Sequence, residues 1–287
     1  MEINVLILAA GRGERMRAAF PYPKALVPID HIPMIIRLLS TLLESVLIIN
    51  RIVIIVRLEE KEMFDRELHR YLPSIYMQKI LLDCQVQEED GYGTASGVQA
   101  FLKRSTDPLA HPLLVLNGDA PLIESVTLEK MTNSFFVKNV DLVIGTVFME
   151  DPRGYGRIAR EDEGGVCIVE QKQINVLPAE HEWHNLREVN TGMYMIHPKL
   201  LPVILTIEDC PITGEKKLTD ICMETASIYL YSSISPDEVL NINSPLDRNH
   251  AEYVLFKKRQ DNIHRPLFAL LQRDIRNHNH NYTNRPL

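Results

Sequence analysis

Short apolar runs rich in β-branched residues alternate with helix-like stretches, and this alternation constrains the fold more than any other feature of the chain. The helix-like stretches carry apolar residues at three- and four-residue spacing. Strands that alternate with helices are typical of a mostly parallel sheet covered on both faces. The sequence therefore predicts an α/β fold with a doubly wound, mostly parallel sheet. The expected strands are 3–8, 52–56, 80–86, 113–116, 142–147, 166–169, 193–196 and 228–231, and the expected helices are 33–46, 59–72, 94–104 and 124–138.

The pattern changes after residue 150, where strand-like runs are separated by turn-rich stretches such as DPRGYG and DEGG. This change predicts a strand-rich insertion over the sheet. We expect one main domain over residues 1–250 and a helical extension over 251–275. Residues 276–287, rich in Asn and His, are expected to form a disordered tail.

The charge balance bears on the partners. The 287 residues carry a formal net charge of −7. Nucleic acids and anionic membrane surfaces attract basic patches, so neither is an expected partner. The four cysteines are scattered, and the N-terminal apolar run 3–10 is too short to span a bilayer and follows Glu2 in place of a basic leader. We therefore expect a cytoplasmic protein with reduced thiols. The sequence is compatible with a homo-oligomer but does not indicate one.

The first expected strand ends in LAAGRGERM, which places Gly11 and Gly13 beside Arg12 and Arg15. Glycines allow positive φ angles and close approach of the backbone, so the exposed N–H groups of such a turn can bind phosphate. A dinucleotide fingerprint requires a third glycine where Met16 stands, and a Walker loop requires Gly-Lys-Ser/Thr, so neither fits. From this stretch alone, a strand-to-helix turn with solvated arginines stays open as the alternative.

Lys24 follows in PYPKALVPI, next to the rigid Pro23. A lysine held beside a phosphate loop would neutralise phosphate charge, whereas a lone surface lysine would do nothing. The short separation between Gly11 and Lys24 allows both to face one pocket.

These two stretches resemble the signature of the sugar nucleotidyltransferase family, L-A-A-G-x-G-T-R-M followed closely by P-K. The resemblance is greatest to the uridylyltransferase domain of the bacterial bifunctional N-acetylglucosamine-1-phosphate uridyltransferases. Further motifs of that domain recur in the same order, as VQEEDGYGTASG, NGDAP, DPRGYGRI, VEQK, VNTG, KLTD and NINSPLD. The acetyltransferase half of those proteins, a β-helix of hexapeptide repeats, has no counterpart after residue 250.

The resemblance implies a Rossmann-like fold of the nucleotide-diphospho-sugar transferase type, in which the insertion binds the sugar. It implies a Mg²⁺-dependent reaction that converts UTP and N-acetylglucosamine 1-phosphate to UDP-N-acetylglucosamine and pyrophosphate. The implied catalytic residues are Arg15, Lys24 and Asp119, and the implied Mg²⁺ ligands are Asp119 and Asn243. The implied nucleotide-binding residues are Leu8, Ala9, Ala10, Gly11, Gly13, Gln87, Gly93, Thr94, Asn117 and Gly118. The implied sugar-binding residues are Gly156, Glu170, Asn190 and Asn243.

The residue types suit this chemistry. A nucleoside triphosphate and a sugar 1-phosphate are both polyanions, and positive charge must neutralise them before they approach each other. Mg²⁺ takes one or two protein oxygens and fills its other positions with phosphate and water, so one carboxylate and one amide oxygen suffice. Asp119 has an alternative role as a helix cap. Glu88 is an alternative to Gln87, because the gap from Gln87 to Gly93 is one residue longer than in the bacterial pattern.

Glu14 and Asn117 depart from the family pattern, which has Thr and Tyr at these positions. Individually, Gly156, Glu170 and Asn190 also fit a turn glycine, a strand-end acid and a turn asparagine. Two other functions stay open. One is nucleotidyl transfer to a different sugar 1-phosphate, such as glucose 1-phosphate with UTP or dTTP. The other is a catalytically silent nucleotide-sugar sensor on the same fold.

Overall fold

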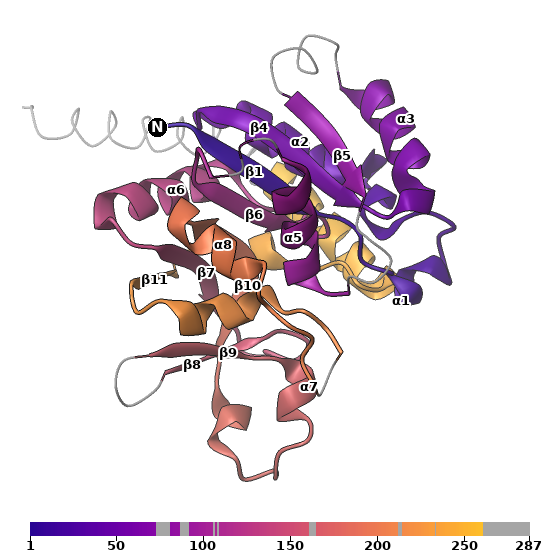
Figure 1. The fold of residues 1–287 in the computed structure, drawn as a ribbon. Coiled ribbons are helices and arrows are strands. Elements are labelled where there is room, and N and C mark those ends of the chain that lie inside the picture. Colours follow the sequence, from indigo (N-terminus) through magenta and orange to yellow (C-terminus); the bar gives the residue numbers. More distant parts are fainter. Residues whose placement is uncertain are drawn as a thin grey trace, which may run out of the picture.

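The computed structural model describes residues 1–72, 92–105, 107, 109–160, 165–211, 214–232 and 234–260, together with the backbone of residues 81–86. Figure 1 shows a central sheet with helices on both sides and a smaller strand-rich part that extends from it.

The central sheet is mixed but largely parallel. In spatial order its strands are β11 (Ile228–Tyr231), β7 (Leu142–Phe148), β10 (Glu188–Ile196), β6 (Leu113–Asn117), β1 (Ile3–Leu8), β4 (Ile49–Val56) and β5 (Leu81–Val86). β1 is parallel to β4 and β6, β4 is parallel to β5, and β11 is parallel to β7. Only β10 on this path runs antiparallel to its neighbours, among the strands that the structure describes. The sheet confirms the predicted doubly wound, mostly parallel α/β class.

Burial on both faces explains why the strands read as continuous apolar runs. Along β1, Val5 and Ile7 pack into the core on one face, and Leu6 packs into the core on the other. β4 begins at Ile49, before its apolar run. Near this start, the Asn50 side chain donates a hydrogen bond to Asn4 Oδ1 on β1 at 2.9 Å. Because these strands run in the same direction, their carboxyl ends lie at the same edge of the sheet. In sheets of this kind, ligands bind at that edge.

The helices divide between the two faces, as Figure 1 shows. The apolar sides of α2 (Met34–Glu44), α3 (Lys61–Tyr71) and α6 (Ser125–Lys138) pack on the face of Val5 and Ile7. The opposite face is covered by α5 (Thr94–Arg104) and α8 (Leu201–Ile204). These bounds agree closely with the predicted helices, because each of the four long helices has an apolar stripe of helical period.

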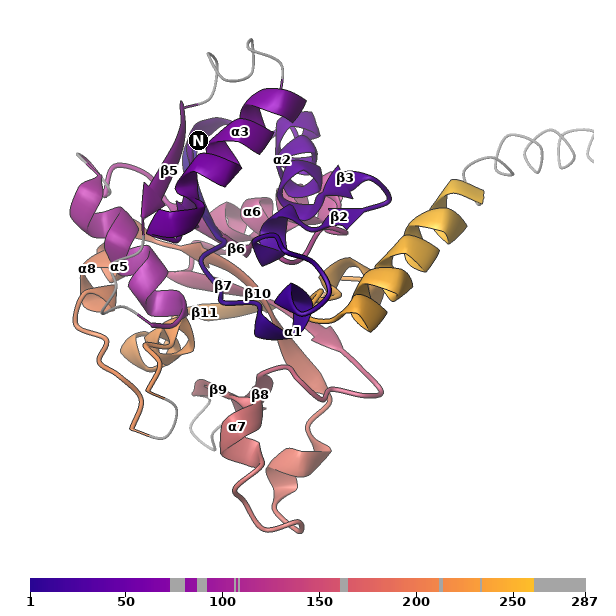
Figure 2. The ribbon, with the colours of Figure 1, turned by 90° about the vertical axis from the view of Figure 1, so that its right-hand side faces the viewer.

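The strand-rich insertion is also present. β8 (Arg157–Arg160) pairs antiparallel with β9 (Val166–Val169) and meets β10 at one residue pair, Arg157 with Val189. Two short helices follow, α7 (Gln171–Ile174) and η3 (Glu182–Asn185). A separate small apolar cluster, which includes Ile174 and Trp183, holds them together. The insertion extends below the sheet in Figures 1 and 2.

A helix over residues 245–260 lies along the side of the main body (Figure 2). Its Ala251 and Val254 pack against Met16, Val27 and Met34. The domain boundary at residue 250 stays a prediction, and most of the expected extension and the whole expected tail lie outside the described residues. Among the helices of the described part, none is both long and apolar enough to cross a membrane.

The packing of α5 against the sheet can be tested at a single apolar side chain. Phe101 of α5 is fully buried against the sheet, so Phe101→Ala should lower the free energy of unfolding by about 3–5 kcal/mol, measured by urea denaturation. Val137→Ala is the control, because Val137 is 70% exposed on α6, and its effect should stay within about 0.5 kcal/mol. Equal losses in the two variants would contradict this packing.

Candidate active site

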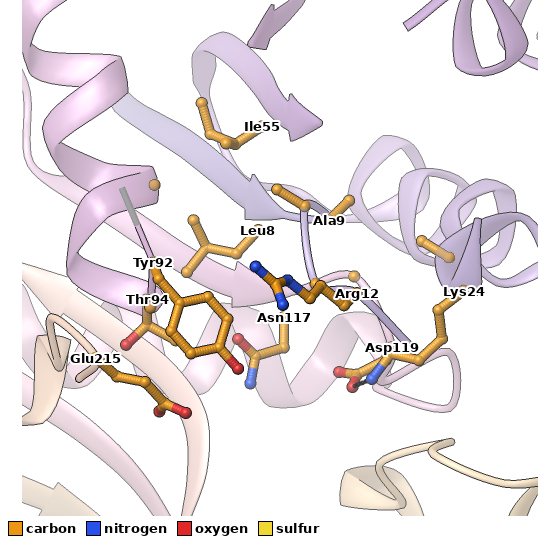
Figure 3. A pocket seen from close by; sticks show the side chains of 16 residues that line it. Leu8, Ala9, Arg12, Lys24, Ile55, Tyr92, Thr94, Asn117, Asp119 and Glu215 are labelled. Atoms are coloured by element: carbon orange, nitrogen blue, oxygen red, sulfur yellow. Dashed lines mark hydrogen bonds and ion pairs between the residues drawn. The ribbon is translucent and has the colours of Figure 1, made fainter. Parts of the chain in front are cut away.

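A cavity of about 280 Å³ opens at the carboxyl ends of β1 and β6 (Figure 3). The register of these two strands places Leu8 beside Asn117, and the Gly118 N–H donates to the Leu8 carbonyl at 2.9 Å. The turns after both strands therefore share one wall. Most of the predicted nucleotide-binding residues line this cavity: Leu8, Ala9, Ala10, Gly11, Gly93, Thr94, Asn117 and Gly118.

The signature turn links β1 to α1 (Glu14–Arg17). Gly13 has a φ of +59°, and a Cβ placed there would lie 2.8 Å from the Cβ of Lys24. The glycine is therefore needed both for the left-handed turn and for the close approach of Lys24. In contrast, a Cβ at Gly11 would meet no atom within 4 Å, so space beside Gly11 is open toward the cavity.

The arginines of the turn take different positions. Arg12 lines the cavity and lies over the ring of Tyr92, with 5.3 Å from its guanidinium carbon to the ring centroid. Figure 3 shows the two side chains next to each other at the mouth. Arg15 is exposed and is not part of the cavity lining in the described structure, so its catalytic role stays a prediction. The sequence assigned no role to Tyr92, because its position in GYGT does not indicate that its ring lies against the Arg12 guanidinium.

Lys24, Asp119 and Asn243 meet although they are distant in sequence. The Lys24 ammonium forms an ion pair with Asp119 Oδ2 and donates to Asn243 Oδ1 at 2.9 Å. The Ile242 N–H donates to the Asp119 carbonyl at 3.0 Å, which fixes the two oxygen-bearing segments side by side. The N-cap of α6 is Glu124, so the helix-cap alternative for Asp119 does not hold.

The donor set of Asp119 and Asn243 fits a divalent cation. The buried Asp119 Oδ1 has no hydrogen-bond partner among the described residues, and the ammonium of Lys24 stands as a cation between Asp119 Oδ2 and Asn243 Oδ1. Carboxylate and amide oxygens are the ligands that Mg²⁺ prefers. The described residues contain no group of three or more His, Cys, Asp or Glu side chains that could hold a metal ion, so a site here would use water and phosphate as its remaining ligands.

The loop that carries Asn243 is held from two sides. Asp247 accepts hydrogen bonds from the backbone N–H groups of Asn243 (2.9 Å) and Ser244 (2.8 Å). From the insertion, the Tyr155 hydroxyl donates to the Val239 carbonyl at 3.2 Å and accepts from the Asn241 N–H at 3.4 Å. The motif GYGR gave no role to this tyrosine before the structure.

Gly93 is placed against the KLTD segment. Its φ is +110°, and a Cβ there would lie 2.3 Å from the carbonyl oxygen of Lys216. The Lys216 N–H donates to the Tyr92 carbonyl at 2.8 Å, and the Leu218 N–H donates to Thr94 Oγ1 at 3.0 Å. These contacts give Gly93 and Thr94 structural roles beside the predicted nucleotide contacts. Gln87 and its alternative Glu88 lie outside the described residues.

The predicted sugar-binding residues of the insertion come together. The Asn190 N–H donates to the Gly156 carbonyl at 2.9 Å, and a Cβ at Gly156 would lie 3.3 Å from the Glu170 carboxylate. Gly192, at a φ of +77°, lies so close to the Asn117 side chain that a Cβ there would be 2.1 Å from Asn117 Nδ2. The three residues therefore adjoin the cavity through Gly192 and Asn117.

Glu170 has a perturbed pKa. Burial raises the pKa of its carboxyl group, and the nearby Lys217 ammonium partly opposes this effect. Glu170 also begins α7 as one half of a capping box with Gln173, and Gln173 Oε1 accepts from Lys217 Nζ at 3.2 Å. Its alternative as a strand-end acid is thus a structural role, and its role in binding the sugar stays a prediction.

The comparisons with known proteins agree with this geometry. The family model of the MobA-like NTP transferase domain matches residues 5–185. The bifunctional protein GlmU of Pseudothermotoga lettingae is 30% identical over 252 residues, which cover 87% of this chain and 51% of that protein. GlmU of Caldanaerobacter subterraneus subsp. tengcongensis is also 30% identical, over 90% of this chain and 52% of its own length. The chain thus spans about half the length of these relatives.

Two solved structures share the fold. One is a putative glucose-1-phosphate thymidylyltransferase from Bacillus anthracis, with a TM-score of 0.68 and 19% identity over 88% of this chain and 95% of that chain. The other is a UDP-glucose pyrophosphorylase in complex with UDP-glucose, with a TM-score of 0.69 and 17% identity over 90% of this chain and 100% of that chain. The topology that surrounds the cavity is therefore one found in nucleotidyltransferases.

The Glu170 pKa predicts a pH-dependent stability. Because the folded-state pKa lies above its ordinary value of 4.5, the carboxylate is disfavoured by folding, and its protonated form is favoured. Relative to Glu170→Gln, the wild type should be most stable below pH 4.5 and should lose stability as the pH rises through the raised pKa. Urea unfolding of both proteins at several pH values between 4 and 8 measures this difference. A constant difference across that window would contradict the burial effect.

Proposed function

Because the chain belongs to the MobA-like NTP transferase domain family, we propose that it is a Mg²⁺-dependent uridylyltransferase. Its proposed substrates are UTP and N-acetylglucosamine 1-phosphate, and its proposed products are UDP-N-acetylglucosamine and pyrophosphate. The substrate choice rests on the ordered motifs and on the similarity to one half of GlmU proteins, over about 90% of this chain.

The observation that carries the proposal is the convergence of Lys24, Asp119 and Asn243 beside the signature turn. A site that joins two polyanions needs concentrated positive charge and oxygen ligands for a cation, at the end of a cavity that admits a nucleotide. In this constellation Lys24 supplies a positive charge and Asp119 and Asn243 supply the oxygen atoms, and Arg12 adds a second cation on the cavity wall. The constellation also argues against the silent sensor, because binding alone does not require the carboxylate and amide to converge with a lysine.

The proposed reaction is an in-line displacement. An oxygen of the acceptor phosphate attacks the α-phosphorus of UTP, the new P–O bond forms, and the bond to the pyrophosphate breaks. The protein forms no covalent intermediate, so its work is positioning and stabilisation of negative charge. Asp119 and Asn243 would hold the Mg²⁺, which when bound supplies charge neutralisation at the phosphates. Among the described residues, Lys24 and Arg12 are the cations that line the cavity, and we assign to them the contacts with the phosphates.

The acceptor sugar is assigned to the insertion. Glu170 and Asn190 offer a carboxylate and an amide, which are suitable partners for sugar hydroxyls and an N-acetyl group. Gly156 allows the sugar and the Glu170 carboxylate to come close to the backbone. A second candidate acceptor is glucose 1-phosphate, with UTP or dTTP, because the two structural neighbours are described as glucose-1-phosphate thymidylyltransferase and UDP-glucose pyrophosphorylase.

The first test measures pyrophosphate release by the purified protein with UTP and Mg²⁺. We expect release with N-acetylglucosamine 1-phosphate to exceed that with glucose 1-phosphate by at least about tenfold. Glucose 1-phosphate lacks the N-acetyl group and would leave the polar groups that bind it unpaired. EDTA should abolish release. Faster release with glucose 1-phosphate would transfer the assignment to that sugar, and binding of UTP without release from either would favour the sensor.

The second test removes the two charges at the centre of the constellation. Lys24→Ala and Asp119→Ala should each lower kcat by at least about a hundredfold, the scale for loss of a key electrostatic contact in an active site. Lys130→Ala is a control, because Lys130 lies on the exposed side of α6, far from the cavity lining. Near-normal turnover in either site variant would remove that residue from the assigned role.

A further inference from the structure

We propose that the ammonium of Lys24 and the divalent cation use the same pair of oxygens in turn. In the free protein, Lys24 occupies the position between Asp119 and Asn243. When the metal arrives with the nucleotide, Lys24 leaves this position and turns to the phosphates. This exchange rests on the proposed function, because it takes Asp119 and Asn243 as the metal ligands.

The first ground is the convergence of three groups on one point. Lys24 Nζ pairs with Asp119 Oδ2 and lies 2.9 Å from Asn243 Oδ1, so one cation already bridges the two oxygens. The side chains of Lys24 and Asp119 are only 15% and 16% exposed, so the pair is largely shielded from water. Asp119 Oδ1, buried and without a partner among the described residues, is the further oxygen that an ammonium does not satisfy.

The second ground is that the two cations exclude each other. A metal ion bound to both oxygens would stand where Lys24 Nζ now lies, and like charges at contact distance repel strongly where water is scarce. Removing either partner of the Lys24–Asp119 pair leaves a poorly solvated charge, which is unfavourable. A cation is therefore needed at this point in both states, and its identity changes between them.

The third ground is that Lys24 has a fixed backbone and a flexible side chain. Its Cβ is held against Gly13, and its carbonyl accepts from the Val27 N–H at 3.0 Å within η1 (Lys24–Leu26). The flexible four-carbon stem lets the ammonium swing about this backbone. Lys24 also lines the cavity, next to Asp119 (Figure 3), so phosphates bound beside Gly11 would lie on the side of the cavity that carries Lys24.

The exchange has a measurable consequence. In the absence of nucleotide the metal must displace Lys24 with no new partner for the ammonium, so the protein alone should bind a divalent cation weakly. A triphosphate gives the displaced ammonium a partner, so metal and nucleotide should each strengthen the binding of the other. Removal of the ammonium should therefore improve metal binding while it destroys catalysis.

The experiment measures Mn²⁺ binding to the full chain without nucleotide, from the electron paramagnetic resonance signal of free Mn²⁺. Lys24→Met should bind Mn²⁺ at least about tenfold more tightly than the wild type, the gain expected when a competing cation is removed. Arg12→Met removes another positive charge from the cavity wall, away from the oxygen pair, and should change affinity by less than about threefold. Lys130→Met is the surface control. Thermal unfolding of each variant checks that it is folded.

A third variant locates the gain. Adding Asp119→Asn to Lys24→Met should return Mn²⁺ affinity to the wild-type value or below, because the carboxylate is then absent. Unchanged or weaker binding by Lys24→Met would overturn the exchange, and so would an equal gain in Arg12→Met, which is a general charge effect. These results are independent of turnover. Failure of pyrophosphate release in the wild type would overturn the proposed reaction while leaving the Mn²⁺ result to decide the exchange.

Discussion

The parallel pairing of β1 with β6 is the constraint on which the site depends. Because both strands run in the same direction, Leu8 and Asn117 end side by side, and the Gly118 N–H bonded to the Leu8 carbonyl locks the two following turns together. One turn carries Gly11, beside which space is open, and the other carries Asp119. The turn after β1 has no long helix to direct it, since α1 has only four residues. The edge of the sheet therefore positions the signature turn and Asp119 next to each other, and Lys24 then forms its ion pair with Asp119.

Close glycine contacts join the separate parts of the site. Gly13 lets Lys24 approach the signature turn, Gly93 lets the segment around Lys216 dock beside the cavity, and Gly192 admits the Asn117 side chain. In each case a Cβ would lie less than 3 Å from a neighbouring atom, and each glycine has a positive φ. The consequence is that these segments pack closely around the cavity, with little room for adjustment. The site is thus built as one unit even though its residues come from segments more than two hundred positions apart.

Much of the fold and part of the site could be predicted from the sequence. The remaining features depend on contacts between distant segments, which a local pattern does not encode. α5 was predictable because its apolar residues recur with helical period. The place of Asp119 was predictable because it follows an apolar strand, and ligands bind beyond the ends of parallel strands. The antiparallel direction of β10 was not, because a buried strand reads the same in both directions. The contact of Arg12 with Tyr92 and the role of the Tyr155 hydroxyl depend on tertiary neighbours and leave no local signal. The exposure of Arg15 shows the converse, since a motif match fixes a position in the chain and not the direction of a side chain.

The hydroxyl of Tyr155 ties the insertion to the loop that bears Asn243, through the Val239 carbonyl and the Asn241 N–H. The next residue is Gly156, where a Cβ would lie 3.3 Å from the Glu170 carboxylate. The residues proposed to bind the sugar and the proposed cation ligand Asn243 are thereby linked in the structure. An attempt to retarget the protein by grafting the insertion of a relative would have to transplant residues 239–243 with it, because an insertion without this tyrosine would leave the loop with its hydrogen bonds to Asp247 but without these two. The modular unit for engineering is therefore discontinuous in sequence, two segments joined by one phenol oxygen.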